Sequence, residues 1–185
     1  MAEVLLFHHA HGLTRGVVAF ADELRAAGHV VHTPDLYDGR TFDDLDGGVA
    51  HAQELGMETV LERGRAAAEG FPAEIVYAGF SLGALPAQLL AQTRPGAAGA
   101  LLLHACERPE DLGGEWPAGV PLQIYTMEGD EWVDLSVARS LAESAGGELF
   151  VYPGNGHLFA DATLPDYDEG AAAVLRQRVL SFLEG

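Results

Sequence analysis

The sequence has a single cysteine and few basic residues, and both shortages narrow what this protein can be. Cys106 has no second cysteine to pair with, so no internal disulfide can form, which suits a protein of the reducing cytosol. Lysine and arginine together number 10 against 28 aspartates and glutamates, which gives a formal net charge of −18. A surface with that charge repels phosphate backbones and anionic lipids, so we expect no nucleic-acid partner and no membrane partner.

Long hydrophobic runs are also lacking. No apolar stretch approaches the roughly 18 residues that a membrane-spanning helix needs. The first residues, Met1–Phe7, contain no basic segment and lead directly into a predicted strand, so we expect no signal peptide. A cytoplasmic protein is the resulting prediction. The length of 185 residues fits one sizeable core, and we expect a single domain over residues 1–185.

Short apolar runs alternate with longer amphipathic stretches along the chain. The expected strands are Val4–His8, Val30–Thr33, Glu74–Ala78, Ala100–His104, Leu122–Thr126 and Glu148–Tyr152. The expected helices are Arg15–Ala27, Gly48–Glu69, Leu82–Gln92, Leu135–Ala145 and Asp168–Leu183. Strands and helices that alternate in this way form βαβ units, which build a mainly parallel sheet between two layers of helices. The sequence therefore predicts a three-layer α/β/α fold with a sheet of about six strands.

Ser81 lies in the segment Gly79-Phe80-Ser81-Leu82-Gly83, between a predicted strand and a predicted helix. The G-x-S-x-G spacing is typical of a strained turn, because side chains at the two glycine positions would collide with neighbouring backbone. Such a turn exposes the serine hydroxyl at the top of the sheet and directs the next backbone N–H at an anion formed there. The pattern predicts a nucleophile. The alternative is a serine that only caps the helix.

A serine nucleophile needs a base, and the base needs a carboxylate that orients it. With this motif the acid and then the histidine follow the serine along the chain. His157, in a glycine-rich loop after the last predicted strand, is the expected base, whereas His104 ends a strand before the candidate acids. Asp130 is the expected acid. Asp134 is the main alternative, although its position just before a helix also suits an N-cap. Glu107, which follows the preceding predicted strand, is a more distant alternative.

Three histidines, His8, His9 and His11, cluster at the end of the first predicted strand. Neighbouring residues of a strand point to opposite faces and the cluster has no i, i+4 pair, so we expect no metal site here. The segment is interpreted as a loop at the pocket mouth, in which the Ala10 N–H is one oxyanion donor and the Leu82 N–H is the other. His9 is the histidine expected to contact substrate.

Five apolar side chains near these motifs could line the pocket or belong to the core: Leu13, Phe42, Trp132, Leu158 and Phe159. Of these, we assign Trp132 to the pocket. No G-x-G-x-x-G segment follows a predicted strand, which argues against a flavodoxin-like nucleotide-binding protein. We expect no cofactor.

Taken in order, these motifs make the whole chain resemble the dienelactone hydrolase family. The resembling segments are His8–Thr14, Thr33–Gly39, Ala78–Ala84, Gly129–Val133 and Tyr152–Phe159. The resemblance implies an α/β-hydrolase fold with strand order 2-1-3-4-5-6, in a form that looks trimmed of the family's usual first hairpin. It also implies a triad of Ser81, Asp130 and His157, with oxyanion donors at Ala10 and Leu82.

Two positions depart from the best-known members of that family. Ser81 stands where those members have cysteine, and His9 stands where they have a glutamate near the oxyanion loop. The resemblance therefore implies hydrolysis of a small ester, lactone or thioester, without specifying dienelactone. We expect a small-molecule substrate and a protein that is a monomer or a homodimer. The alternative is a non-catalytic small-molecule binding module on the same fold, with a vestigial triad.

Overall fold

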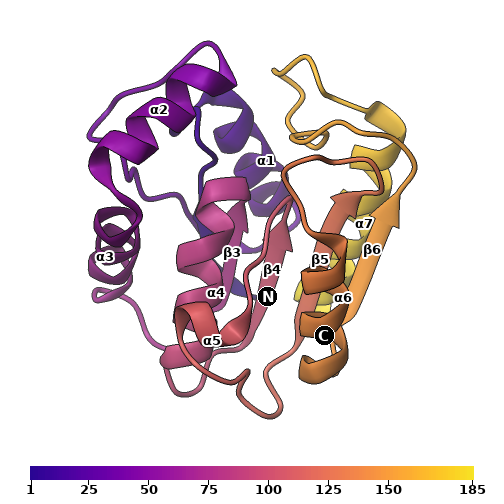
Figure 1. The fold of residues 1–185 in the computed structure, drawn as a ribbon. Coiled ribbons are helices and arrows are strands. Elements are labelled where there is room, and N and C mark those ends of the chain that lie inside the picture. The colour runs from indigo at the N-terminus through magenta and orange to yellow at the C-terminus, as the bar shows by residue number, and fades with distance from the viewer.

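The computed structural model describes residues 1–185 and contains one six-stranded sheet between two layers of helices (Figure 1). The strands are β1 (Glu3–Phe7), β2 (Val30–His32), β3 (Val76–Phe80), β4 (Gly99–Leu103), β5 (Leu122–Met127) and β6 (Glu148–Tyr152). They lie in the order β2-β1-β3-β4-β5-β6, and every neighbouring pair is parallel. The predicted fold class and strand order are confirmed.

Seven α-helices and one 3-10 turn connect the strands. They are α1 (Arg15–Ala26), α2 (Leu45–Leu55), α3 (Met57–Ala68), η1 (Ser81–Gly83), α4 (Ala84–Thr93), α5 (Pro109–Leu112), α6 (Leu135–Ala145) and α7 (Glu169–Glu184). Side chains of α1 and α7 pack on one face of the sheet, while those of α2, α3, α4 and α6 pack on the other. None of the helices combines the length and the apolar character that a membrane span requires.

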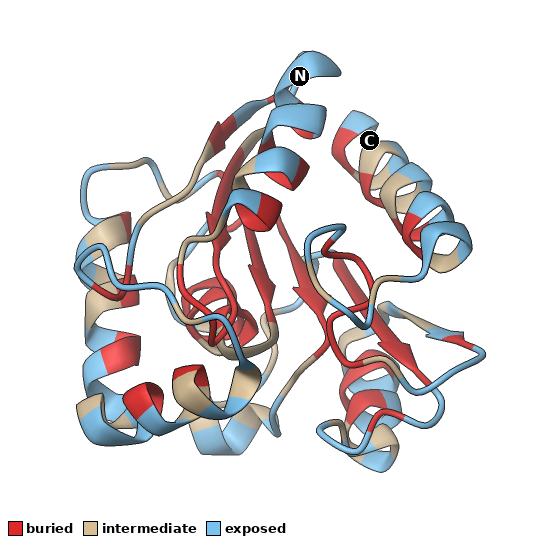
Figure 2. Cartoon of the chain, turned by 90° about the horizontal axis from the view of Figure 1, so that it is seen from above, coloured by how far each residue is buried: buried red, intermediate tan, exposed pale blue.

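The core has two halves because successive strand residues point to opposite faces of the sheet. In β1, Val4 and Leu6 belong to the half beneath α1 and α7, whereas Leu5 and Phe7 belong to the other half. Figure 2 shows the central strands almost entirely buried, and most helices are buried only along their inward sides, whereas α4 is buried over most of its length. A sheet covered on both faces explains why these strands are apolar throughout rather than alternating.

Two differences from the sequence prediction affect the site. The sequence predicts one helix over Gly48–Glu69, but Gly56 adopts a φ of 82°, which favours glycine, and separates α2 from α3 at a corner. The third strand is predicted to end at Ala78, but β3 continues to Phe80, so that it leads directly into Ser81. A further helix, the short α5, lies between β4 and β5, where the sequence predicts no helix.

Candidate active site

Ser81 lies at the junction of β3 and η1, and its backbone is strained. Its φ of 50° is in the left-handed region, which is uncommon for residues other than glycine. The flanking glycines are packed against backbone: a Cβ at Gly79 would lie 2.0 Å from the Gly83 carbonyl oxygen, and one at Gly83 would lie 2.5 Å from the His8 carbonyl oxygen. The surrounding backbone therefore holds the turn in one shape and fixes the direction of the serine side chain.

Three side chains from different loops form a continuous chain of hydrogen bonds. The Ser81 Oγ lies 2.6 Å from His157 Nε2, and His157 Nδ1 lies 2.8 Å from Asp130 Oδ2. Ser81 follows β3, Asp130 follows β5 and His157 follows β6, and the carboxyl ends of these parallel strands share one edge of the sheet. The structure thus brings together the three residues that the sequence order selects. With Nδ1–H donating to the carboxylate, Nε2 is free to accept the serine proton.

The carboxylate of Asp130 is held on both sides. Its Oδ1 accepts the backbone N–H of Trp132 at 2.9 Å, while its Oδ2 contacts His157. The alternative acid, Asp134, is occupied elsewhere: it is exposed and caps α6 by accepting the Ser136 N–H at 2.8 Å. Hydrogen bonds from the Ser136 side chain and backbone lower the pKa of Asp134. The structure therefore joins Asp130, and not Asp134, to His157.

The backbone N–H groups of Ala10 and Leu82 are the expected oxyanion donors. Ala10 and Leu82 line the same cavity as Ser81. The Ala10 N–H has no hydrogen-bond acceptor within the protein, and the Leu82 N–H lies in the first turn of η1, where helical N–H groups lack intrahelical partners. Helix α2 packs closely against the peptide group of Ala10. The approach occurs at Gly48 of α2, where a Cβ would lie only 2.2 Å from the Ala10 carbonyl oxygen.

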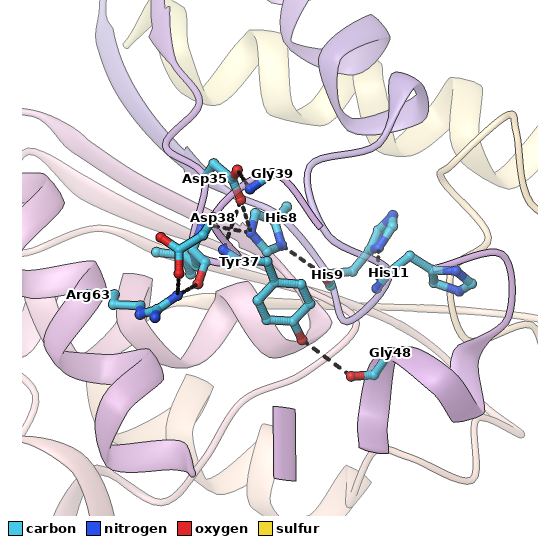
Figure 3. Close-up of polar contacts among 10 residues, drawn as sticks. His8, His9, His11, Asp35, Tyr37, Asp38, Gly39, Gly48 and Arg63 are labelled. Carbon is cyan, nitrogen blue, oxygen red and sulfur yellow. Dashed lines mark hydrogen bonds and ion pairs between the residues drawn. The ribbon is translucent and has the colours of Figure 1, made fainter. Parts of the chain in front are cut away.

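Two rings of the histidine cluster, those of His8 and His11, are hydrogen-bonded to backbone groups, and Figure 3 shows the contacts of the His8 ring. The His8 ring bridges two segments: its Nδ1 lies 2.8 Å from the His9 carbonyl oxygen, and its Nε2 accepts the Leu36 N–H at 2.9 Å. The His11 Nδ1 lies 2.9 Å from the Phe42 carbonyl oxygen. Burial lowers the pKa of His8 to about 4, so its ring is neutral at pH 7 and can accept at Nε2 while donating at Nδ1. These rings therefore fix the shape of the loop that carries Ala10.

His9 does not line the pocket as expected, because its ring points into the protein. Its Nε2 lies 2.8 Å from Asp161 Oδ2, and its Nδ1 accepts the His11 N–H at 3.3 Å. Burial lowers the pKa of His9 despite the neighbouring carboxylate. Burial raises the pKa of Asp161, but hydrogen bonds from His9 and Thr163 outweigh it and leave that pKa lowered. The pair is therefore a neutral imidazole donating to a buried carboxylate.

His104 lies close to the triad without joining its hydrogen bonds. It is fully buried, and its ring packs against Phe80 and Phe159 at centroid distances of 5.7 and 4.7 Å. Neither ring nitrogen has a hydrogen-bond partner. Burial holds the pKa of His104 well below its usual value, so the ring is neutral and acts as an aromatic core residue.

A cavity of about 400 Å³ opens beside Ser81. Trp132 lines it, as the sequence predicts, and its ring lies 5.7 Å from that of His157, between centroids. Most of the apolar wall comes from residues that the sequence did not single out: Leu45, Val49, Ala52, Met57, Leu85, Ala105 and Cys106. The other apolar candidates lie elsewhere. Leu158 and Phe159 are buried, and Leu13 and Phe42 border a different hollow.

Comparisons with known proteins agree with this architecture. A model of the dienelactone hydrolase family matches residues 1–185. No curated protein matches the sequence.

Among solved structures, a dienelactone hydrolase-like promiscuous phosphotriesterase from metagenomic libraries has a TM-score of 0.78 and 17% identity, covering 100% of this chain and 86% of that one. A Klebsiella pneumoniae protein provisionally named as a dienelactone hydrolase has a TM-score of 0.75 and 18% identity, covering 100% and 87%. A thermophilic esterase from Thermogutta terrifontis has a TM-score of 0.61 and 19% identity, covering 99% and 82%.

Proposed function

The chain belongs to the dienelactone hydrolase family, and on that basis we propose that it is a serine hydrolase that cleaves a small ester, lactone or thioester through an acyl-enzyme intermediate. The observation that carries the proposal is the chain of hydrogen bonds from Ser81 through His157 to Asp130, at 2.6 and 2.8 Å. The Ser81 end of this chain borders a cavity that Ala10 also lines, and the Ala10 N–H has no acceptor in the protein.

In the first half of the reaction, Ser81 Oγ attacks the carbonyl carbon while His157 Nε2 takes the hydroxyl proton. Asp130 stabilises the imidazolium that forms and keeps its ring in place. The negative charge on the carbonyl oxygen is stabilised by the N–H groups of Ala10 and Leu82. The intermediate collapses when its bond to the leaving group breaks, and His157 gives the proton to the departing alkoxide or thiolate.

In the second half, water replaces the leaving group. His157 Nε2 takes a proton from the water as its oxygen attacks the acyl carbon, and a second oxyanion forms at the same N–H groups. The bond to Ser81 Oγ then breaks, the serine regains its proton from His157, and the free carboxylic acid leaves. A lactone follows the same steps, except that its leaving alcohol stays attached to the released acid.

Cys106 lines the cavity but is unsuited to be the nucleophile. Burial, with the nearby carboxylates of Glu107 and Asp134, raises the pKa of its thiol to about 12. At pH 7 the group is therefore a thiol rather than the reactive thiolate. The structure records no histidine hydrogen-bonded to Cys106, whereas His157 is hydrogen-bonded to Ser81.

A substrate panel tests the proposed reaction class. We expect the purified protein to hydrolyse short p-nitrophenyl esters, with an aliphatic lactone and an acyl thioester assayed alongside to rank the three classes. Boiled protein supplies the background rate. If none of the three is hydrolysed above background while a small ester binds the protein in a calorimetric titration, the protein is a non-catalytic binding module and not an enzyme.

We expect Asp161→Ala to reduce kcat about 10- to 100-fold with little change in KM. The substitution removes the partner of the His9 Nε2–H, and His9 in turn holds the loop that carries Ala10; a shift of about 1 Å at such a loop has effects of this size. The buried, unpaired Nε2–H should also cost about 1–3 kcal/mol in unfolding free energy. Steady-state kinetics and urea unfolding measure the two effects.

The matched control for that substitution is Thr163→Val. It removes the Thr163 hydroxyl bond to Asp161 Oδ1 but leaves the contact between Asp161 and His9. We expect it to lose stability with kcat unchanged. A folded Asp161→Ala protein with wild-type kcat would show that the oxyanion loop does not depend on this pair.

We further propose that the protein works in the cytoplasm on a small molecule, as a monomer or homodimer. The single cysteine and the net charge of −18 support this setting, since both suit a soluble protein that does not engage nucleic acid or anionic membranes.

A further inference from the structure

The residues that line the cavity come from both sides of β3. The strand order places β5 and β6, with Asp130 and His157, on one side of β3, and places β1 and β2 on the other. The helices α2 and α3 follow β2, and Figure 1 shows them on the opposite side of the molecule from the loop after β6. The nucleophile therefore lies between a side that carries His157 and Trp132 and a side formed by the α2–α3 corner.

The proposed mechanism assigns a different part of the substrate to each side. The leaving group must depart next to His157, because the Nε2 of that ring supplies its proton. The carbonyl oxygen must point at Ala10 and Leu82. The acyl group is the one remaining substituent on the reacting carbon, so it extends away from His157, toward the α2–α3 corner.

We call the residues on that side the acyl wall: Leu45, Val49, Ala52, Gln53 and Met57 from α2 and α3, with Leu85 from α4. Five of them are apolar, and Gln53 is uncharged. No lysine or arginine lines any part of the cavity, and the one acidic residue among its lining residues is Glu107, in the segment that follows β4. A negative charge on the acyl group would therefore meet no cation.

We propose that the enzyme selects uncharged, apolar acyl groups and rejects acyl groups that carry a carboxylate. This inference rests on the proposed function and specifies its substrate class. A carboxylate moved from water to the acyl wall loses hydration without gaining a partner. Glu107 and the net charge of −18 also repel a carboxylate on the acyl group. Salt weakens this long-range repulsion, but it does not reduce the cost of removing the carboxylate from water.

Two esters of equal chain length test the selectivity: p-nitrophenyl pentanoate and mono-p-nitrophenyl glutarate, in which a carboxylate replaces the terminal methyl group. After subtraction of spontaneous hydrolysis, we expect kcat/KM to be about 100-fold lower for the glutarate, and to stay well below that of the pentanoate at about 0.5 M salt. From acetate to pentanoate, each added methylene should raise kcat/KM by up to about 4-fold. Glutarate turnover within a few-fold of pentanoate turnover overturns the selectivity and leaves the proposed function intact, whereas loss of turnover for both esters overturns the proposed function.

A pair of substitutions at Gln53 tests where the acyl group lies. Gln53 is exposed on α2 and lines the cavity, so both Gln53→Arg and Gln53→Glu fit without disturbing the core. We expect Gln53→Arg to raise kcat/KM for the glutarate about 10-fold relative to the pentanoate, because it supplies the missing cation. Gln53→Glu should lower that ratio or leave it unchanged. If the two variants give the same ratio, the acyl group does not lie against α2 and the assignment of the acyl wall is wrong.

Discussion

Ser81→Ala is expected to lower kcat for p-nitrophenyl ester hydrolysis by on the order of 10⁴- to 10⁶-fold, because it removes the atom that forms the acyl-enzyme. The residual rate would come from the oxyanion donors and from substrate binding alone. The variant should fold normally, since only a hydroxyl is lost and alanine meets the same backbone requirement at a φ of 50° as serine does. Steady-state kinetics give the rate, and circular dichroism with thermal melting confirms the fold.

Two further variants sharpen this result. Ser140→Ala removes an exposed serine hydroxyl on α6 and should leave kcat unchanged. Ser81→Cys keeps a nucleophilic atom beside His157 and should retain far more activity than Ser81→Ala, since a thiol next to an imidazole is readily activated. Turnover by Ser81→Ala within 10-fold of the wild-type rate would remove Ser81 from the mechanism.

Asp130→Asn is expected to reduce kcat by about 10⁴-fold, because an amide at this position can stabilise the wrong tautomer of the histidine. Asp130 Oδ2 lies 2.8 Å from His157 Nδ1, and an asparagine that donates there would force the imidazole proton onto Nε2, where it blocks proton transfer from Ser81. The pH profile of kcat/KM should change together with the rate, which a loss of packing alone would not cause.

Asp134→Asn is the matched comparison four residues away. Asp134 caps α6 through Ser136 and makes no contact with His157. We expect a small drop in melting temperature and a kcat close to wild type. A large loss of kcat in Asp134→Asn, with Asp130→Asn nearly unaffected, would exchange the roles of the two carboxylates.

The fold could be predicted from the sequence because its signals are local and repeated. Each strand is a short apolar run and each long helix an amphipathic one, and the right-handed βαβ connection leaves few ways to assemble them. The errors lie at positions where a single residue determines where a helix or strand ends. Gly56 turns one predicted helix into two, and β3 continues through Phe80 to Ser81 instead of ending at Ala78.

The three residues of the proposed triad could be selected from the sequence because the chain order in this fold restricts the choice of acid and base. The structural role of His9 could not be predicted from the sequence, since its hydrogen-bond partner Asp161 lies 152 residues further along the chain. The acyl wall was also beyond reach, because which side chains of α2 face Ser81 depends on the corner at Gly56 and on the close approach of Gly48 to Ala10. Helical spacing alone shows an apolar face but not what it covers.

The most direct test of the central claim is mass spectrometry of the protein after treatment with a fluorophosphonate. The probe reacts with an activated serine, so the account predicts one adduct per chain on the peptide that contains Ser81 and none in the Ser81→Ala variant. Labelling should fall sharply in Asp130→Asn, because the same histidine activates the serine. An unlabelled wild-type protein, or an adduct confined to another serine, would contradict the account.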